Sequence, residues 1–143
     1  MTVHYQHDAI ATFPVPTGTV FRYMSAGNHQ HAAFKSHRLV GVSGDLVTIE
    51  AEIYNPDGTT FSTTIEHRLD RPKSVKTTMI GGSFDGATFT HTYTAVDGRT
   101  KVDLAGEFPE MPGMTEGDEL AMIDGFFMMV FDEDAMSLTT WTP

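Results

Sequence analysis

Apolar and polar residues alternate with a period of two along most of the chain after residue 36, which is typical of half-buried β-strands. Turn-forming groups such as Asn55-Pro-Asp-Gly58 and Asp97-Gly98 divide this stretch into short segments. Because the connections are short, successive strands are expected to pair antiparallel. The predicted strands cover residues 3–13, 37–42, 46–54, 60–69, 74–80, 87–95 and 99–108.

The same alternation predicts which side chains face a covered side of the sheet. The solvent side is expected to carry charged residues, including Glu50, Glu52, Glu66 and Arg68. The covered side is expected to carry Val47, Ile49, Ala51, Ile53, Phe61, Thr63, Ile65, His67, Leu69, Phe89, His91, Tyr93, Val102, Leu104, Gly106 and Phe108.

The last apolar segment, residues 120–138, is long and free of proline, which favours a helix over a strand. Thr115 is its expected N-cap, with Asp118 three residues later. On a helical wheel the apolar side is centred on Ile123, Phe126, Phe127 and Val130. Asp134 lies on the same stripe. A carboxylate in an apolar core costs on the order of several kcal/mol unless it is paired, protonated or bound to a metal.

Two short helices are expected between the first strand and the remaining strands, at residues 20–24 and 29–35. The order of elements indicates an α+β fold, a seven-stranded curved antiparallel sheet wrapped around a long C-terminal helix, with the two short helices after the first strand. The chain contains no linker or internal repeat, so residues 1–143 are expected to form one domain.

This order of elements resembles the START or SRPBCC superfamily, the helix-grip fold of plant pollen allergens, polyketide cyclases and lipid-transfer domains. The resemblance implies a cavity between sheet and helix that holds an apolar or aromatic small molecule. Such a cavity is expected to occupy at least about 300 Å³. The residues expected to line it are Thr63, Thr77, Met79, Phe89, Met122, Ile123, Phe126, Phe127 and Val130.

The composition and net charge of the chain exclude some kinds of site and disfavour some classes of binding partner. The chain contains no cysteine, which excludes disulfides and thiolate-bound metal centres within it. A formal net charge of −10, with only nine Lys and Arg, disfavours nucleic acids and anionic membranes as partners. The sequence also has no signal-peptide pattern and no run of about 18 apolar residues, so a cytoplasmic protein is expected.

Three polar residues, His67, His91 and Tyr93, fall on the covered side of the predicted sheet. An imidazole and a phenol inside a cavity can polarise a carbonyl group or move a proton. The resemblance to polyketide cyclases therefore implies acid–base chemistry of the kind that cyclisation and dehydration require. In the alternative interpretation these side chains are ordinary hydrogen-bonded core residues, and the protein is a carrier without catalytic activity.

A second candidate site combines histidines after the first strand with Asp134 of the last helix. The arrangement resembles the catalytic domain of Rieske-type ring-hydroxylating oxygenases, in which two histidines spaced H-x4-H and one aspartate bind iron. The resemblance implies that His31 and His37, here spaced H-x5-H, and Asp134 bind a single Fe or Zn ion. His29 could replace either histidine. In the alternative interpretation, Asp134 forms a hydrogen bond with a histidine or arginine without a metal.

Overall fold

The computed structural model describes residues 2–26 and 31–142, and these residues have the predicted α+β fold. The elements are β1 (Thr2–Phe13), α1 (Thr17–Ala26), β2 (Phe34–Ser43), β3 (Leu46–Tyr54), β4 (Thr60–Asp70), β5 (Ser74–Ile80), β6 (Thr88–Val96), β7 (Arg99–Pro109) and α2 (Glu116–Leu138). No described helix has both the length and the apolar composition that spanning a bilayer requires.

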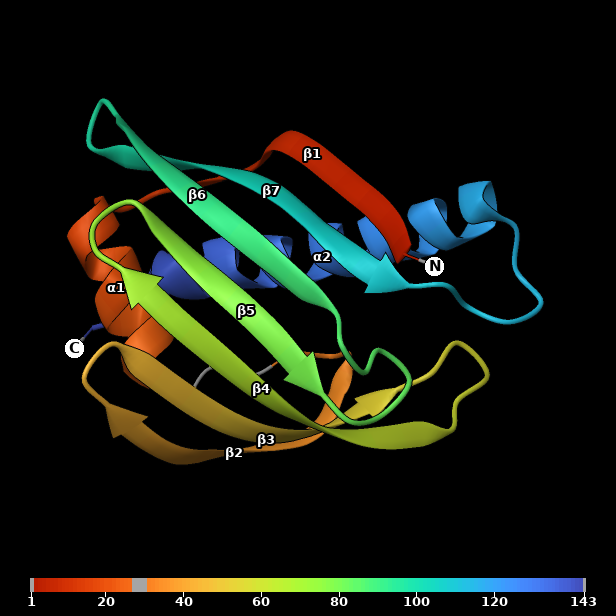
Figure 1. Ribbon diagram of the computed structural model, residues 1–143. Helices are drawn as coiled ribbons and strands as arrows, with labels where there is room; N and C mark the ends of the chain where they lie inside the picture. Colours follow the sequence, from red (N-terminus) through yellow and green to blue (C-terminus); the bar gives the residue numbers. More distant parts are fainter. Residues whose placement is uncertain (1, 27–30, 143) are drawn as a thin grey trace.

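The described strands form one seven-stranded antiparallel sheet in the order β1-β7-β6-β5-β4-β3-β2. Helix α2 lies across one face of this curved sheet, and α1 lies at one end of it (Figure 1). The pairing register shifts in both edge strands, between His7 and Ala11 of β1 and twice in β2. Such bulges increase the local bend and twist of a strand. The curvature leaves space between the sheet and α2.

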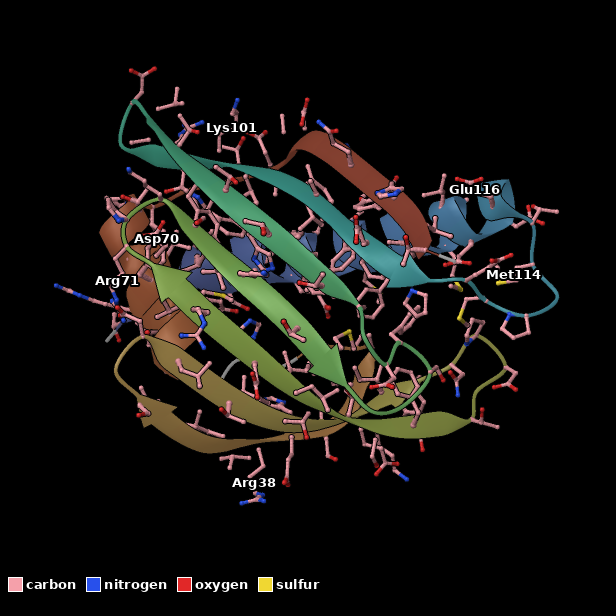
Figure 2. All side chains as sticks on the ribbon, viewed as in Figure 1. Arg38, Asp70, Arg71, Lys101, Met114 and Glu116 are labelled. Atoms are coloured by element: carbon pink, nitrogen blue, oxygen red, sulfur yellow. The ribbon has the colours of Figure 1, made fainter. Side chains whose placement is uncertain are left out.

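The predicted inward positions are confirmed. Ile49 lies opposite Ile65, and His67 lies opposite Thr77 in the next pair, so the buried side chains of neighbouring strands share one side of the sheet. Alternating burial is clearest in β3 and β4. On the other side, Arg38 projects into solvent, where it forms an ion pair with Glu50 (Figure 2).

Helix α2 begins as predicted, because the Thr115 side chain accepts a hydrogen bond from the Asp118 amide at 3.1 Å. Its buried face differs in detail from the predicted one. Phe126 and Val130 are only half-buried, and the most buried line runs through Phe131. The fully buried residues, spaced mostly four apart, are Glu119, Ile123, Phe127, Phe131, Asp134 and Leu138.

The prediction of a second short helix at residues 29–35 is wrong for its described part. Ala32 and Ala33 form a turn, and Phe34 already belongs to β2, where it pairs with Ile53 of β3. The strand ladder satisfies backbone groups that a helical turn would have left exposed. The first short helix is longer than predicted and covers Thr17–Ala26. His29 lies outside the described residues.

We expect Gly125→Ala to raise the free energy of unfolding by about 0.5–1 kcal/mol, because glycine is a poor helix former. Gly125 is exposed in the middle of α2, and an added Cβ would meet no other part of the chain within 4 Å. Urea denaturation measures the change.

Gly106→Ala in β7 is the matched control and should lower the free energy of unfolding by about 1–3 kcal/mol. A Cβ at Gly106 would collide with Phe89 and with the carbonyl oxygen of Thr88. Destabilisation by Gly125→Ala would contradict the described exposure of that position.

Candidate functional site

A small cavity lies between the sheet and the C-terminal half of α2, and we refer to it as the histidine cavity. Its volume is about 70 Å³. Most of its walls are apolar, contributed by both helices and by strands β2 to β6. Its polar lining consists of one hydroxyl, one carboxylate and four imidazoles, those of Thr77, Asp134, His31, His37, His67 and His91. Several polar groups therefore converge on an otherwise apolar space.

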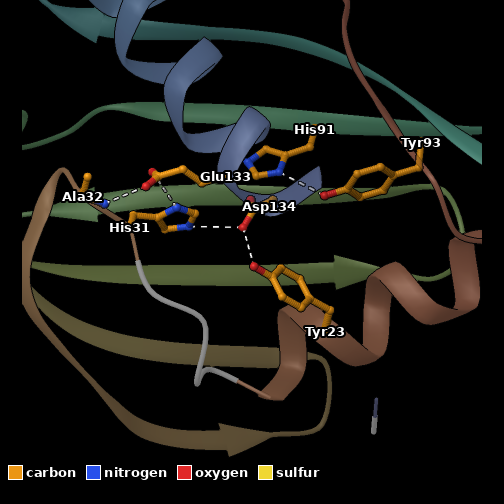
Figure 3. A network of polar contacts seen from close by, with 7 residues as sticks. All are labelled: Tyr23, His31, Ala32, His91, Tyr93, Glu133 and Asp134. Atoms are coloured by element: carbon orange, nitrogen blue, oxygen red, sulfur yellow. Dashed lines mark hydrogen bonds and ion pairs between the residues drawn. The ribbon is translucent and has the colours of Figure 1, made fainter. Parts of the chain in front are cut away.

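Asp134 is the charged centre of this lining and is only 3% exposed. The Tyr23 hydroxyl of α1 donates a hydrogen bond of 2.6 Å to Asp134 Oδ1. Nε2 of His31 lies 3.3 Å from the same oxygen (Figure 3). Burial and the Asp134 charge raise the pKa of Tyr23, so this phenol keeps its proton and acts as the donor. The buried carboxylate is thus held by side chains from α1 and from the segment before β2.

His31 lies between two carboxylates of α2. Its Nδ1 lies 3.3 Å from Oε1 of Glu133, while the Ala32 amide donates to the other oxygen of Glu133 at 2.9 Å (Figure 3). Burial alone would lower the pKa of His31, but the contact with Asp134 and the charges of Asp134 and Glu133 together raise it. His31 is therefore the buried imidazole with the strongest support for a positive charge.

A second polar set continues across β4, β5 and β6 as a chain of hydrogen bonds. His67 Nδ1 lies 2.7 Å from the Thr77 hydroxyl, which lies 3.4 Å from His91 Nε2, and His91 Nδ1 lies 3.1 Å from the Tyr93 hydroxyl. Burial, with the nearby His67, lowers the pKa of His91 to about 3. Burial and the Asp134 charge raise the pKa of Tyr93. Both residues are therefore neutral near pH 7.

Each of these hydrogen bonds has one donor and one acceptor when the protons are all donated in the same direction, from Tyr93 toward His67. Tyr93 donates to His91 Nδ1, His91 Nε2 donates to the Thr77 oxygen, and Thr77 donates to His67 Nδ1. His67 then carries its proton on Nε2, and His67 lines the histidine cavity. With this assignment, the neutral hydrogen bonds run from Tyr93 to His67, a residue of the cavity lining.

A second space, the apolar hollow, lies nearer the N-terminal half of α2 and has a volume of about 230 Å³. It shares Met79, Phe126 and Phe127 with the histidine cavity. The prediction of one cavity of at least about 300 Å³ between sheet and helix is therefore wrong, because two smaller spaces lie there instead. Phe126 is half-buried, and its ring meets that of Phe127 edge to face at 5.4 Å. The shared aromatic side chains divide the space beneath α2.

The structure places eight of the nine predicted pocket residues in these two spaces. Thr63 is the exception. It is buried, but its hydroxyl donates to the carbonyl oxygen of Ile80, and it borders a groove at the β2 edge of the sheet. Of the predicted residues, those that line the histidine cavity are Thr77, Met79, Phe89, Phe126, Phe127 and Val130, and those that line the apolar hollow are Met79, Met122, Ile123, Phe126 and Phe127.

The predicted metal ligands His31, His37 and Asp134 all line the histidine cavity. The contact of His31 with Asp134 is the metal-free hydrogen-bonded arrangement that the sequence left open. Within residues 2–26 and 31–142, no three His, Asp or Glu side chains are placed so that they could share a metal ion. The described geometry therefore gives the metal hypothesis no support.

Sequence reasoning missed two polar partners of the cavity lining, Tyr23 and Glu133. Tyr23 is 1% exposed on the buried face of α1, and an inward-facing phenol in an apolar helix was the available signal. From its position in the sequence, Glu133 belongs to the solvent-facing side of the helix. It is part of the site because the segment that contains His31 folds against it. Nothing in the sequence indicates that contact.

Comparison with known proteins finds the same fold with little shared sequence. No protein-family model and no curated protein matches the chain. A START superfamily protein from Mycobacterium smegmatis superposes with a TM-score of 0.76 at 9% identity, over 99% of both chains. Ara h 8.0201 superposes with a TM-score of 0.73 at 16% identity, and the match covers 99% of this chain and 100% of that one. The Zhui aromatase/cyclase from Streptomyces sp. R1128 superposes with a TM-score of 0.71 at 13% identity, and the match covers 94% of this chain and 91% of that one.

We expect Tyr23→Phe to lower the free energy of unfolding by about 1.5–3 kcal/mol, because it removes a hydrogen bond to a buried carboxylate. Tyr54→Phe is the matched control, since Tyr54 is 45% exposed, and it should change stability by less than about 0.5 kcal/mol. Chemical denaturation of both variants makes the comparison. Equal effects would show that the phenol of Tyr23 does not stabilise Asp134.

The raised pKa of His31 also predicts a pH dependence of stability. A group whose pKa is higher in the folded state stabilises fully below its unfolded value of about 6.5, and this contribution is lost as the pH rises through the folded pKa. The stability difference between the wild type and His31→Gln should therefore shrink above about pH 6.5. His4→Gln, on the exposed side of β1, is the control. A difference that stays constant with pH would contradict a charged His31.

Proposed function

We propose that this chain, which has the helix-grip fold of the START/SRPBCC superfamily, binds an apolar or aromatic small molecule between its sheet and α2. The observation that carries this proposal is the histidine cavity, where six polar side chains converge within apolar walls. Small-molecule sites in proteins combine a mostly apolar lining with a few placed polar groups. The polar side chains would orient one end of the ligand, and the apolar walls would hold the rest.

The two spaces limit the size of the ligand. A polar group would occupy the histidine cavity, and the apolar part would extend past Phe127 toward the apolar hollow. Rotation of the half-buried Phe126 would open this path. A small aromatic molecule matches the combined space better than a long lipid chain does.

A second candidate function is acid–base catalysis in the same cavity, and the chain from Tyr93 to His67 favours it. Two of the structural relatives are aromatase/cyclases, and cyclisation with dehydration requires a proton donor and a proton acceptor. The predicted catalytic set His67, His91 and Tyr93 would then act as a neutral relay that ends at His67. His31, which is held near two carboxylates, would supply the acid.

The binding proposal is tested by filling the histidine cavity. Val130→Trp places a large side chain at a half-buried lining position of α2 and should weaken binding of 2-phenylethanol at least about tenfold. Met128→Trp, at a position 42% exposed on the same helix, should leave binding unchanged. Titrations followed by NMR shifts of the protein amides give both the affinity and the location.

Circular dichroism and urea denaturation establish that each tryptophan variant is folded before its affinity is compared. Equal binding by the two variants, or shift changes confined to the outer face of the sheet, would overturn the proposal.

A further inference from the structure

The charges around the histidine cavity are unevenly distributed. Asp134 is buried in its wall, whereas none of the nine Lys and Arg residues lines it. Eight of the nine are exposed and Lys101 is half-buried. Arg38 points away from the body of the protein (Figure 2). Arg71, from the turn between β4 and β5, is engaged with Asp45 and Ser25. The strong cations of the chain therefore lie outside the cavity.

His31 does not reverse this imbalance. It contacts Asp134 through one ring nitrogen and Glu133 through the other, so a single imidazole faces two carboxylates. With both carboxylates ionised, the three groups carry one net negative charge when His31 is protonated and two when it is neutral. In either state this polar cluster (His31, Glu133 and Asp134) is a negative end for a bound molecule.

The second polar set supplies hydrogen bonds without charge. Tyr93 and His91 are buried and neutral, and they act on the cavity through Thr77 and His67. A carboxylate or phosphate brought into this space would be desolvated beside a buried anion, and both effects oppose its binding. An ammonium group would be desolvated too, but the nearby carboxylates would offset that cost.

We infer that the histidine cavity selects its ligand by charge, taking an apolar amine in preference to a neutral alcohol and rejecting carboxylates and phosphates. This inference rests on the proposed binding function and names its ligand class. The ammonium would lie at the polar cluster, near Asp134 (Figure 3), and the apolar part would lie against the aromatic rings of α2.

The test compares three molecules with one apolar skeleton, namely 2-phenylethylamine, 2-phenylethanol and phenylacetate. Titrations by NMR at about pH 8, above the ordinary pKa of an imidazole, compare the three head groups. We expect the amine to bind at least about tenfold more tightly than phenylacetate. Repeating the titrations at about 1 M salt, where the Debye length is about 3 Å, removes the general attraction of the acidic surface for cations.

Asp134→Asn should reduce the preference for the amine over phenylacetate at least about tenfold. Glu133→Gln should act in the same direction and tests the cluster if Asp134→Asn does not fold. Asp132→Asn, on the exposed side of α2, is the matched control and should leave the preference unchanged.

The two proposals fail in different ways. Absence of binding by all three molecules, including 2-phenylethanol, would overturn the proposed binding function. Binding of phenylacetate as tight as that of the amine, with the alcohol also bound, would overturn the charge selection and leave the binding function standing.

Discussion

The arrangement of both helices depends on the burial of one carboxylate. Asp134 lies on a helix face that otherwise packs aromatic and aliphatic side chains, where an unpaired charge would cost on the order of several kcal/mol. Its nearest polar contacts come from Tyr23 of α1 and from His31 in the segment before β2. Packing of α1 and the start of β2 against α2 therefore supplies what Asp134 needs. The constraint also explains why polar groups occur at this end of the core.

The neighbouring side chains shift the pKa values of two buried histidines in opposite directions. Both His31 and His91 are removed from water, which by itself favours the neutral ring. His31 has carboxylates at both ring nitrogens, and their attraction exceeds the cost of burial. His91 has only the Thr77 hydroxyl and the Tyr93 phenol, with another imidazole nearby, so its charged form has no compensation. Neighbouring side chains thus divide the cavity wall into a charged and a neutral part.

Much of the fold could be predicted because alternation and helical periodicity are local properties. The strand boundaries, the Thr115 cap and the burial of Asp134 follow from them. The partners of Asp134 do not, because Tyr23 is 111 residues away and its contact exists only after α1 has packed. The prediction of a helix at residues 29–35 was wrong because a contact distant in sequence, the pairing of Phe34 with Ile53, decides the conformation at Phe34. Glu119 is buried and accepts the Met111 amide of the preceding loop, a contact without a sequence signal.

The comparison structures separate what the fold contributes from what this chain adds. At 9–16% identity they share the sheet and the helix that covers it, which accounts for the place of the cavity but not for its lining. The lining is set by individual choices, such as threonine at 77 between two histidines and aspartate at 134 among phenylalanines. Each of these polar groups lies where an apolar residue would pack without needing a partner. Under the proposed function, their combined presence at one wall would serve the recognition of a bound molecule.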